Sequence, residues 1–496
     1  MTIESLTLSR FINLRYAESK ANKMNRIIDF FNINTYPEGK RKQFKFNISL
    51  GILVMIFFLI IKDTAVIQAS INGWLDYYIM FRMKSGTDTH IAAQNITFLD
   101  FDNKSFQILG KPDITPRDKI AELLAIAYGD NAKIVVLDFD FSEPDYTPSK
   151  ILGDDKLAKS GSERDQTLFS IIEQIKNDTE SQTKILLPLI NYADKTIKHN
   201  IFKSLIDNQK VFAVTPTLTT NQIGDNYARF WLPYLEVKDK ETSERKILWS
   251  IPLLSAVLYS GNFEELEKHK NEILNTSKDS FSIDINHNNT EQFKFYREKN
   301  IDGGLMRDTT SLQYNRIQYV AIPPNVLTAS PLGTIDPSNI WHWRKDGLDN
   351  KRIDCQDKIV IIGRADEDCT DFFATPCGNL SGMYIHGNGI ASILGDTHPH
   401  LAPLYKYVFL EIFLIIITAY LFLVLSEIKA SIIVVCLKIL CLVLNYIYFC
   451  YTNEFVYMSF CFLFLGVYNF INSIQRAFII GRLSLNSTFR RFFRRI

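Results

Sequence analysis

The sequence Lys-Ile-Val-Val-Leu-Asp-Phe-Asp at residues 133–140 decides the fold class. Its β-branched and apolar residues, ended by acidic ones, are typical of a buried strand that reaches a polar surface. The segment Asn-Ile-Thr-Phe-Leu-Asp-Phe-Asp at residues 95–102 has the same pattern. Between the two, apolar residues at positions 120, 123, 124 and 127 of the stretch 117–128 have helical spacing. Strand, helix and strand in this order predict a parallel pair of strands.

Further apolar runs extend this pattern along the chain. Residues 183–190 (TKILLPLI) and 358–363 (KIVIIG) are expected to be strands, and an amphipathic stretch follows Ser162. The polar region 195–300, with a charged helix predicted at 262–274, is expected to supply strands and insertions at the sheet edge. Continuous apolar strands that alternate with helices indicate a sheet covered on both faces. The predicted fold class is therefore α/β, with a mostly parallel sheet covered by helices.

The predicted strands end in acidic residues. In open parallel sheets, groups at the carboxyl ends of the strands gather in one crevice. We therefore expect Asp100, Asp102, Asp138 and Asp140 to converge there with the residues that follow Gly363.

Four long apolar segments predict transmembrane helices, since a bilayer core needs about 20 mostly apolar helical residues. They are residues 46–70, 405–427, 430–452 and 454–475. Two charges, Glu411 and Lys438, fall inside them. An intramembrane charge usually faces a partner or a water-filled path, although Glu411 is close enough to its span end to reach the interface.

Basic residues flank the first and the last span and predict the orientation of the chain. The flanking residues are Lys40, Arg41, Lys42 and Lys45 before the first span, and Arg476, Arg482, Arg490, Arg491, Arg494 and Arg495 after the last. Both termini, residues 1–45 and 476–496, are therefore expected in the cytoplasm and residues 71–404 outside it. We expect a multi-pass protein of the bacterial inner membrane with a periplasmic domain. Membrane lipids are then obligatory partners.

The overall charge gives no reason to expect a polyanionic partner. The chain has 55 Lys and Arg against 54 Asp and Glu, a net charge of +1. No nucleic-acid partner is therefore expected.

Several motifs, in order, resemble the CHASE2 family of extracytoplasmic sensory domains. The motifs are Asp100 to Asp102 with Ser105 and Gly110, Pro116-Arg117, the strand at 135–140, Asp302-Gly303 with Arg307, and the segments 358–363, 371–376 and 382–388. The resemblance covers residues 70–400 and implies one transmembrane span before the domain and three after it. CHASE2 proteins usually continue into a cytoplasmic catalytic domain. The residues after Gln475 are too few for one, so we expect the signal to pass to a separate membrane or cytoplasmic protein.

Two alternatives are open for the acidic strand ends. Arg117 and Arg307, with Asp302 nearby, would neutralise them in a structural ion-pair network, which we favour. The carboxylates would otherwise bind a divalent cation. A strand ending in Asp-x-Asp is also found in phosphohydrolases of the haloacid dehalogenase type, but Lys104 and Ser142 stand where that pattern has Thr or Val. We predict no enzymatic activity, no cofactor and no metal.

Three residues after the 358–363 strand are candidate ligand or structural groups: Asp371, Thr375 and His386. His386 is expected just before a helix, as a hydrogen-bonded anchor, whereas a metal site with His398 and His400 is the less favoured alternative. Cys369 and Cys377 are the candidate disulfide pair, because bridges persist outside the cytoplasm.

These observations favour a sensory or scaffolding membrane protein that senses or docks an extracytoplasmic ligand or partner and signals to a separate protein. One alternative is a structural component of a multi-protein envelope complex, and another is an aspartate-dependent periplasmic hydrolase. Homo-oligomerisation is compatible with each.

Overall fold

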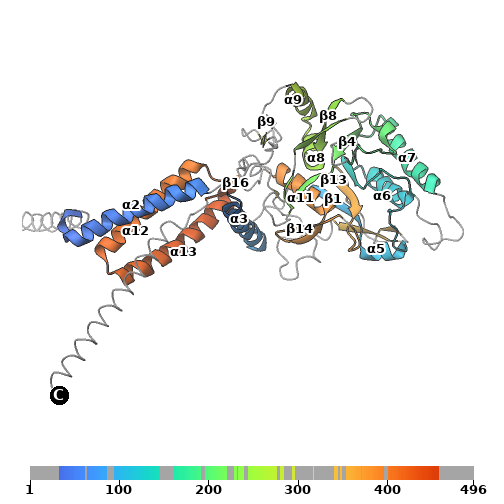
Figure 1. Cartoon of the computed structure of the whole chain (residues 1–496). Coiled ribbons are helices and arrows are strands. Elements are labelled where there is room, and N and C mark those ends of the chain that lie inside the picture. The colour runs from blue at the N-terminus through green and yellow to red at the C-terminus, as the bar shows by residue number, and fades with distance from the viewer. Residues whose placement is uncertain are drawn as a thin grey trace, which may run out of the picture. The chain divides into compact units, whose positions relative to one another are not determined.

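The structure is a computed structural model that describes residues 33–61, 64–85, 94–145, 161–191, 196–220, 228–231, 233–238, 244–275, 280–283, 293–296, 317, 340–344, 347–348, 354–369, 371–395 and 400–456. The chain forms two compact units (Figure 1). The first, the membrane unit, contains Met1–Lys62, Ala402–Ile447 and Val456–Ile496. The second, the sheet unit, contains Asp63–Leu401 and Tyr448–Phe455.

A nine-stranded sheet forms the centre of the sheet unit. Its strands lie in the spatial order β12 (Gly347–Leu348), β11 (Ile340–Arg344), β1 (Ile96–Phe101), β13 (Ile359–Arg364), β2 (Ile134–Asp138), β3 (Lys184–Pro188), β4 (Val211–Thr215), β8 (Arg245–Ser250) and β7 (Tyr234–Lys238). All neighbours are parallel except the two edge pairs, β11–β12 and β7–β8. The predicted α/β class with a mostly parallel sheet is therefore confirmed.

The first two predicted strands are parallel but do not pair with each other. β13 lies between them, with Gly363 level with Asp100 of β1 and with Asp138 of β2. Residues 359–363 are all buried. This is expected for a continuous apolar run that lies in the interior of a parallel sheet. The prediction of a direct β1–β2 pair was wrong, because a strand from late in the chain is inserted.

One face of the sheet is covered by the helices α6 (Arg117–Gly129) and α7 (Gly161–Asn177). The inward side of α6 carries Ile120, Leu123, Leu124 and Ala127, which are fully buried in one core cluster with side chains of the sheet. The helix α5 (Asn103–Ile108) follows β1 directly, and Asp102 caps it by accepting a hydrogen bond from the Ser105 amide at 2.8 Å.

The opposite face is covered by α8 (Ile251–Ser260) and α11 (Gly382–Leu394), which also contact each other. All residues of α11 from Gly382 to Ile393 are buried. Gly387 is required there, because a Cβ at this position would collide with the ring of Phe98 on β1. The helix begins four residues before His386, so the prediction that it starts just after His386 was wrong.

The remaining elements lie at the edges of the sheet or in short hairpins. The charged helix α9 (Phe263–Asn275) confirms the prediction for 262–274. The others are β5 (Leu218–Thr220) with β6 (Ala228–Trp231), β9 (Ser280–Ile283) with β10 (Phe293–Tyr296), β14 (Phe372–Thr375) with β15 (Gly378–Ser381), and the 3-10 turn Lys203–Leu205.

The membrane unit contains three helices long and apolar enough to cross a bilayer within the described residues. They are α2 (Glu38–Ile61), α12 (Leu404–Val424) and α13 (Glu427–Thr452), whose last residues belong to the sheet unit. A short 3-10 turn, Ile33–Thr35, precedes α2. Met55 of α2 packs with Ile415 of α12, and Phe44 packs with Ala419 and Leu423.

Two boundaries of the predicted spans differ. The first predicted span, 46–70, is instead α2, which ends at Ile61, and a separate helix, α3 (Ala65–Ser85). The predicted fourth span, 454–475, does not start at Glu454, because Glu454–Phe455 forms the short strand β17 paired with β16 (His400–Leu401). Residues 457–475 lie outside the described part of the chain.

Candidate functional site

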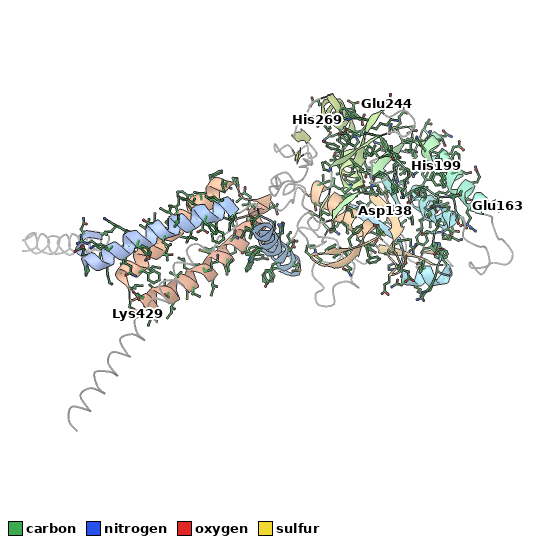
Figure 2. All side chains as sticks on the ribbon, viewed as in Figure 1. Asp138, Glu163, His199, Glu244, His269 and Lys429 are labelled. Atoms are coloured by element: carbon green, nitrogen blue, oxygen red, sulfur yellow. The ribbon has the colours of Figure 1, made fainter. Side chains whose placement is uncertain are left out.

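A cavity of about 520 Å³ lies at the carboxyl ends of the central strands. Asp138 and Arg364 are the last residues of β2 and β13, Pro188 is the last of β3, and Pro216 follows β4. The cavity is thus at the position where parallel sheets gather the ends of their strands. Figure 2 shows Asp138 in the centre of the sheet unit, whereas Glu163 lies at its periphery.

Two carboxyl groups, Asp138 and Asp371, form the floor of this cavity and interact with each other. Burial raises the pKa of Asp138 well above its usual range, and the charge of Asp371 raises it further. Burial also raises the pKa of Asp371 to about 6, although the Gly382 amide opposes this shift. Because two close carboxylates in a poorly solvated site resist simultaneous ionisation, the site favours the protonated form of each group.

Gly382, the first residue of α11, allows the Asp371 side chain to occupy its position. A Cβ on Gly382 would overlap the Asp371 carboxylate, and the Gly382 amide donates a hydrogen bond to the Asp371 carbonyl at 2.9 Å. The carboxylate therefore lies over the amino-terminal end of α11, where partial positive charge stabilises its ionised form.

His386, on the second turn of α11, completes the floor of the cavity. Its side chain is 2% exposed, and its Nε2 lies 4.0 Å from Asp138 Oδ1. Burial lowers the pKa of His386 to about 3, with the Pro216 carbonyl opposing part of the shift. The ring is therefore neutral, and within the described residues its buried Nδ1 has no hydrogen-bond partner.

The Arg117 guanidinium at the cavity wall is already engaged. Its Nη2 donates to the Asp140 carbonyl at 2.8 Å, its Nε lies 3.8 Å from Asp165, and it stacks on the Phe141 ring. The predicted bond from Arg117 to an acidic strand end is thus made to the backbone of Asp140, while the Asp140 carboxylate accepts from the Ser142 amide.

The Arg364 guanidinium is engaged in the same way. It forms a two-pronged ion pair with the buried Asp366, at 2.7 and 2.8 Å. The guanidinium carbon also lies over the Phe106 ring, 4.6 Å from the ring centroid. Neither arginine is therefore directed at Asp138 or Asp371.

Asp100 and Asp102 belong to a different cluster from Asp138 and Asp140. The Asp100 carboxylate accepts a hydrogen bond from Tyr384 at 2.6 Å and also bonds to His342, which lies 3.7 Å from Asp102. Burial raises the pKa of Asp100 despite these contacts. The structure therefore divides the predicted crevice into a cavity beside β2 and a structural cluster beside β1.

The other predicted residues have local roles or lie elsewhere. Thr375 accepts from the Cys377 amide and donates to the Gly378 carbonyl, closing the β14–β15 turn. Asp302 and Arg307 lie outside the described residues. His400 is in β16, and His398 is also outside.

The predicted disulfide between Cys369 and Cys377 is absent, and both thiols are free. Cys369 lines the cavity, and its sulfur accepts from the Asp371 amide at 3.5 Å. Cys377 instead lies in the turn after β14. The two cysteines therefore belong to different local structures and do not pair.

Sequence reasoning missed a fully buried ion pair, Arg164 with Asp145. Their side chains are 1% and 0% exposed, with bonds of 2.8 and 3.1 Å, and Asp145 also accepts from the Arg117 amide. Neither residue stands in a recognisable motif, so only the contact itself identifies the pair.

In the membrane unit, Glu411 and Lys438 are 1% and 7% exposed. Both act electrostatically on Cys441 and therefore face the helix bundle rather than its outer surface. The expectation that Glu411 reaches the interface was therefore wrong, and both residues follow the alternative that an intramembrane charge faces the interior.

Comparison with known families identifies the domain. The profile of the CHASE2 domain matches residues 51–425. This chain belongs to the CHASE2 family. CHASE2 is an extracytoplasmic sensory domain, so the sheet unit is a sensory module carried by a membrane protein. No curated protein and no solved structure matched the chain significantly.

Proposed function

We propose that the protein is a membrane-anchored receptor whose CHASE2 domain binds a small extracytoplasmic ligand in the cavity beside Asp138. The observation that carries the proposal is this 520 Å³ cavity, which is of the size of small-molecule sites and lies at the carboxyl ends of the sheet. The cavity combines apolar walls with a few convergent polar groups on its floor, Asp138, Asp371 and His386. We assign these groups a binding role and no catalytic one.

Signal transfer through the membrane helices is part of the proposal. His386 and Gly382 are in α11, and the chain continues from α11 through β16 into α12. A ligand that tightens the position of α11 would bias the helix that follows it, because a ligand shifts an equilibrium by its different affinities for two states. We place the domain in the periplasm of a bacterium and the output on a separate protein.

A variant with a blocked cavity tests this function. In Leu218→Trp, a larger side chain enters the cavity wall, while Glu264→Trp, on the exposed side of α9, is the matched control. Purified full-length proteins in detergent are screened with small metabolites by thermal unfolding. Compounds that stabilise the parent and the control, but not Leu218→Trp, and that change hydrogen exchange in α12, support the receptor.

Two outcomes would contradict it. Compounds that stabilise Leu218→Trp as well as the parent would show that the cavity is not the binding site. A stoichiometric multi-protein assembly that forms equally well with Leu218→Trp would favour the alternative of a structural envelope component.

A further inference from the structure

The polar groups on the cavity floor lack a cation. Asp138 is 8% exposed, and no described residue donates a hydrogen bond to its carboxylate; the neutral His386 ring lies 4.0 Å away. Within the described part of the chain, the Asp371 carboxylate has the Gly382 amide as its donor and no cation. Buried carboxyl groups are usually paired with a cation or a donor, so this pair has unused capacity as an acceptor.

The two arginines of the wall do not fill this need. Arg364 is paired with Asp366, and Arg117 is bound to the Asp140 carbonyl and to Asp165. Asp113 and Asp140 add further acidic groups at the rim of the same cavity. The local charge available to a ligand is therefore negative, which disfavours carboxylates and phosphates.

The walls around these acceptors are apolar. Phe139 and Phe373 contribute aromatic rings, and Pro188, Ile190 and Leu218 contribute aliphatic surface. Such walls bind an apolar body, and aromatic rings also attract an adjacent cation.

We propose that the cavity binds a small organic cation, with a primary ammonium group held between Asp138 and Asp371 and a compact apolar body against Phe139 and Phe373. An ammonium group donates three hydrogen bonds. Two would go to the two carboxyl groups, and the third faces the neutral ring of His386, whose Nε2 lies 4.0 Å from Asp138 Oδ1. This inference rests on the proposed function and names the ligand class for the same site.

Matched probes test the ligand class on the full-length protein in detergent. Benzylamine, benzyl alcohol and benzoate have the same ring and differ in the charge of the head group, as do pentylamine, pentanol and pentanoate. Isothermal titration calorimetry is expected to detect both amines, and to show at least tenfold weaker binding of each alcohol and each acid. Equal binding of amine and alcohol, or preferred binding of the acid, would overturn the proposal.

Variants of the floor assign the binding to this site. Asp138→Asn and Asp371→Asn keep the size of the side chain and are each expected to weaken amine binding at least tenfold. Asp354→Asn is the control, because Asp354 is 69% exposed and pairs with Lys358 outside the cavity. Unchanged amine binding by both floor variants would overturn the proposal even if the amine bound tightly.

The ligand class and the receptor function fail in different ways. If no amine binds but another compound stabilises the parent and not Leu218→Trp, the ligand class is wrong and the receptor function stands. If amines bind equally to Leu218→Trp and to the parent, both are wrong.

Discussion

Asp138 and Asp371 are far apart in the sequence, yet folding places both carboxyl groups in one poorly solvated cavity, where no cation of the described residues pairs with either. Folding therefore favours their protonated forms. For Asp371 the pKa rises from 3.8 to about 6. A folded-state pKa above the unfolded one contributes stability that is complete below the unfolded pKa and is lost as pH rises through the folded pKa.

We therefore expect the parent to lose stability between about pH 4 and pH 6, by on the order of 2 to 3 kcal/mol from this group. Asp371→Asn removes the titrating group and should flatten this part of the curve. Thermal unfolding from pH 4 to pH 7.5 measures the stability of the parent and of Asp371→Asn, with Asp354→Asn as the exposed control. Parallel curves for the parent and Asp371→Asn would show that Asp371 has no raised pKa.

A second prediction at this scale concerns the buried pair of Arg164 and Asp145. Asp145→Asn removes the charged partner that forms a two-pronged pair with Arg164, which is 1% exposed, and weakens the cap on the Arg117 amide. Loss of one partner of a buried pair costs about 3 to 5 kcal/mol. The matched control, Asp140→Asn, alters an exposed carboxylate that accepts a hydrogen bond from the Ser142 amide and should change stability by about 0.5 kcal/mol or less. Chemical denaturation measures the free energy of unfolding of both variants. Equal losses of stability in Asp145→Asn and Asp140→Asn would contradict this prediction.

Among the elements, α11 depends on close approach to the sheet. Gly387→Ala would place a methyl group on the Phe98 ring and near Ile361 Cδ1, so the helix must move away. Overpacking of this kind costs about 1 to 3 kcal/mol, and displacement of α11 would also move His386. Gly73→Ala in α3 meets nothing within 4 Å and should be neutral or slightly stabilising.

The two glycine variants are compared by urea unfolding, and Phe98→Leu is combined with Gly387→Ala. The smaller side chain is expected to restore part of the lost stability, since it removes the obstructing ring. If Gly387→Ala unfolds at the same urea concentration as the parent, the helix is not held at close contact.

The local sequence pattern predicted the bounds of helices and strands better than it predicted which strands are neighbours in the sheet. The helix predicted at 262–274 is Phe263–Asn275, and β2 and α6 also lie close to their predicted bounds. Insertion of β13 between β1 and β2 was not predictable, because strand order depends on contacts between residues far apart in the chain. The start of α11 was misplaced because glycines, which usually interrupt helices, here serve close packing against Phe98.

The residues of the site were predictable in part, because local sequence pattern indicates which residues stand at the ends of strands. Position after an apolar strand suggested Asp138, Asp371 and His386, and all three line the cavity. The sequence does not show which cations are already engaged. Arg117 and Arg364 have other partners, so the cavity is acidic rather than neutralised.

At the scale of the whole molecule, charge and span number predict the membrane topology. The described spans α2, α12 and α13 are followed by the apolar segment 457–475, and basic residues precede α2 and follow that segment. With a cytoplasmic amino terminus, α2 leads the chain outward, α12 returns it and α13 leads it outward again. Asn453 would then be outside, and Ile496 would be inside only if a fourth span exists.

Fusions of alkaline phosphatase, which is active only outside the cytoplasm, at four successive points test this arrangement. We expect activity after Leu401, none after Ser426, activity after Asn453 and none after Ile496. A fluorescent protein that folds only in the cytoplasm should give the reverse pattern at the same points. Activity after both Asn453 and Ile496 would remove the fourth span, whereas inversion at all four points would overturn the orientation derived from Lys and Arg. The alternating result alone places the acidic cavity on the outer side, because an odd number of crossings must separate it from the basic ends of the chain.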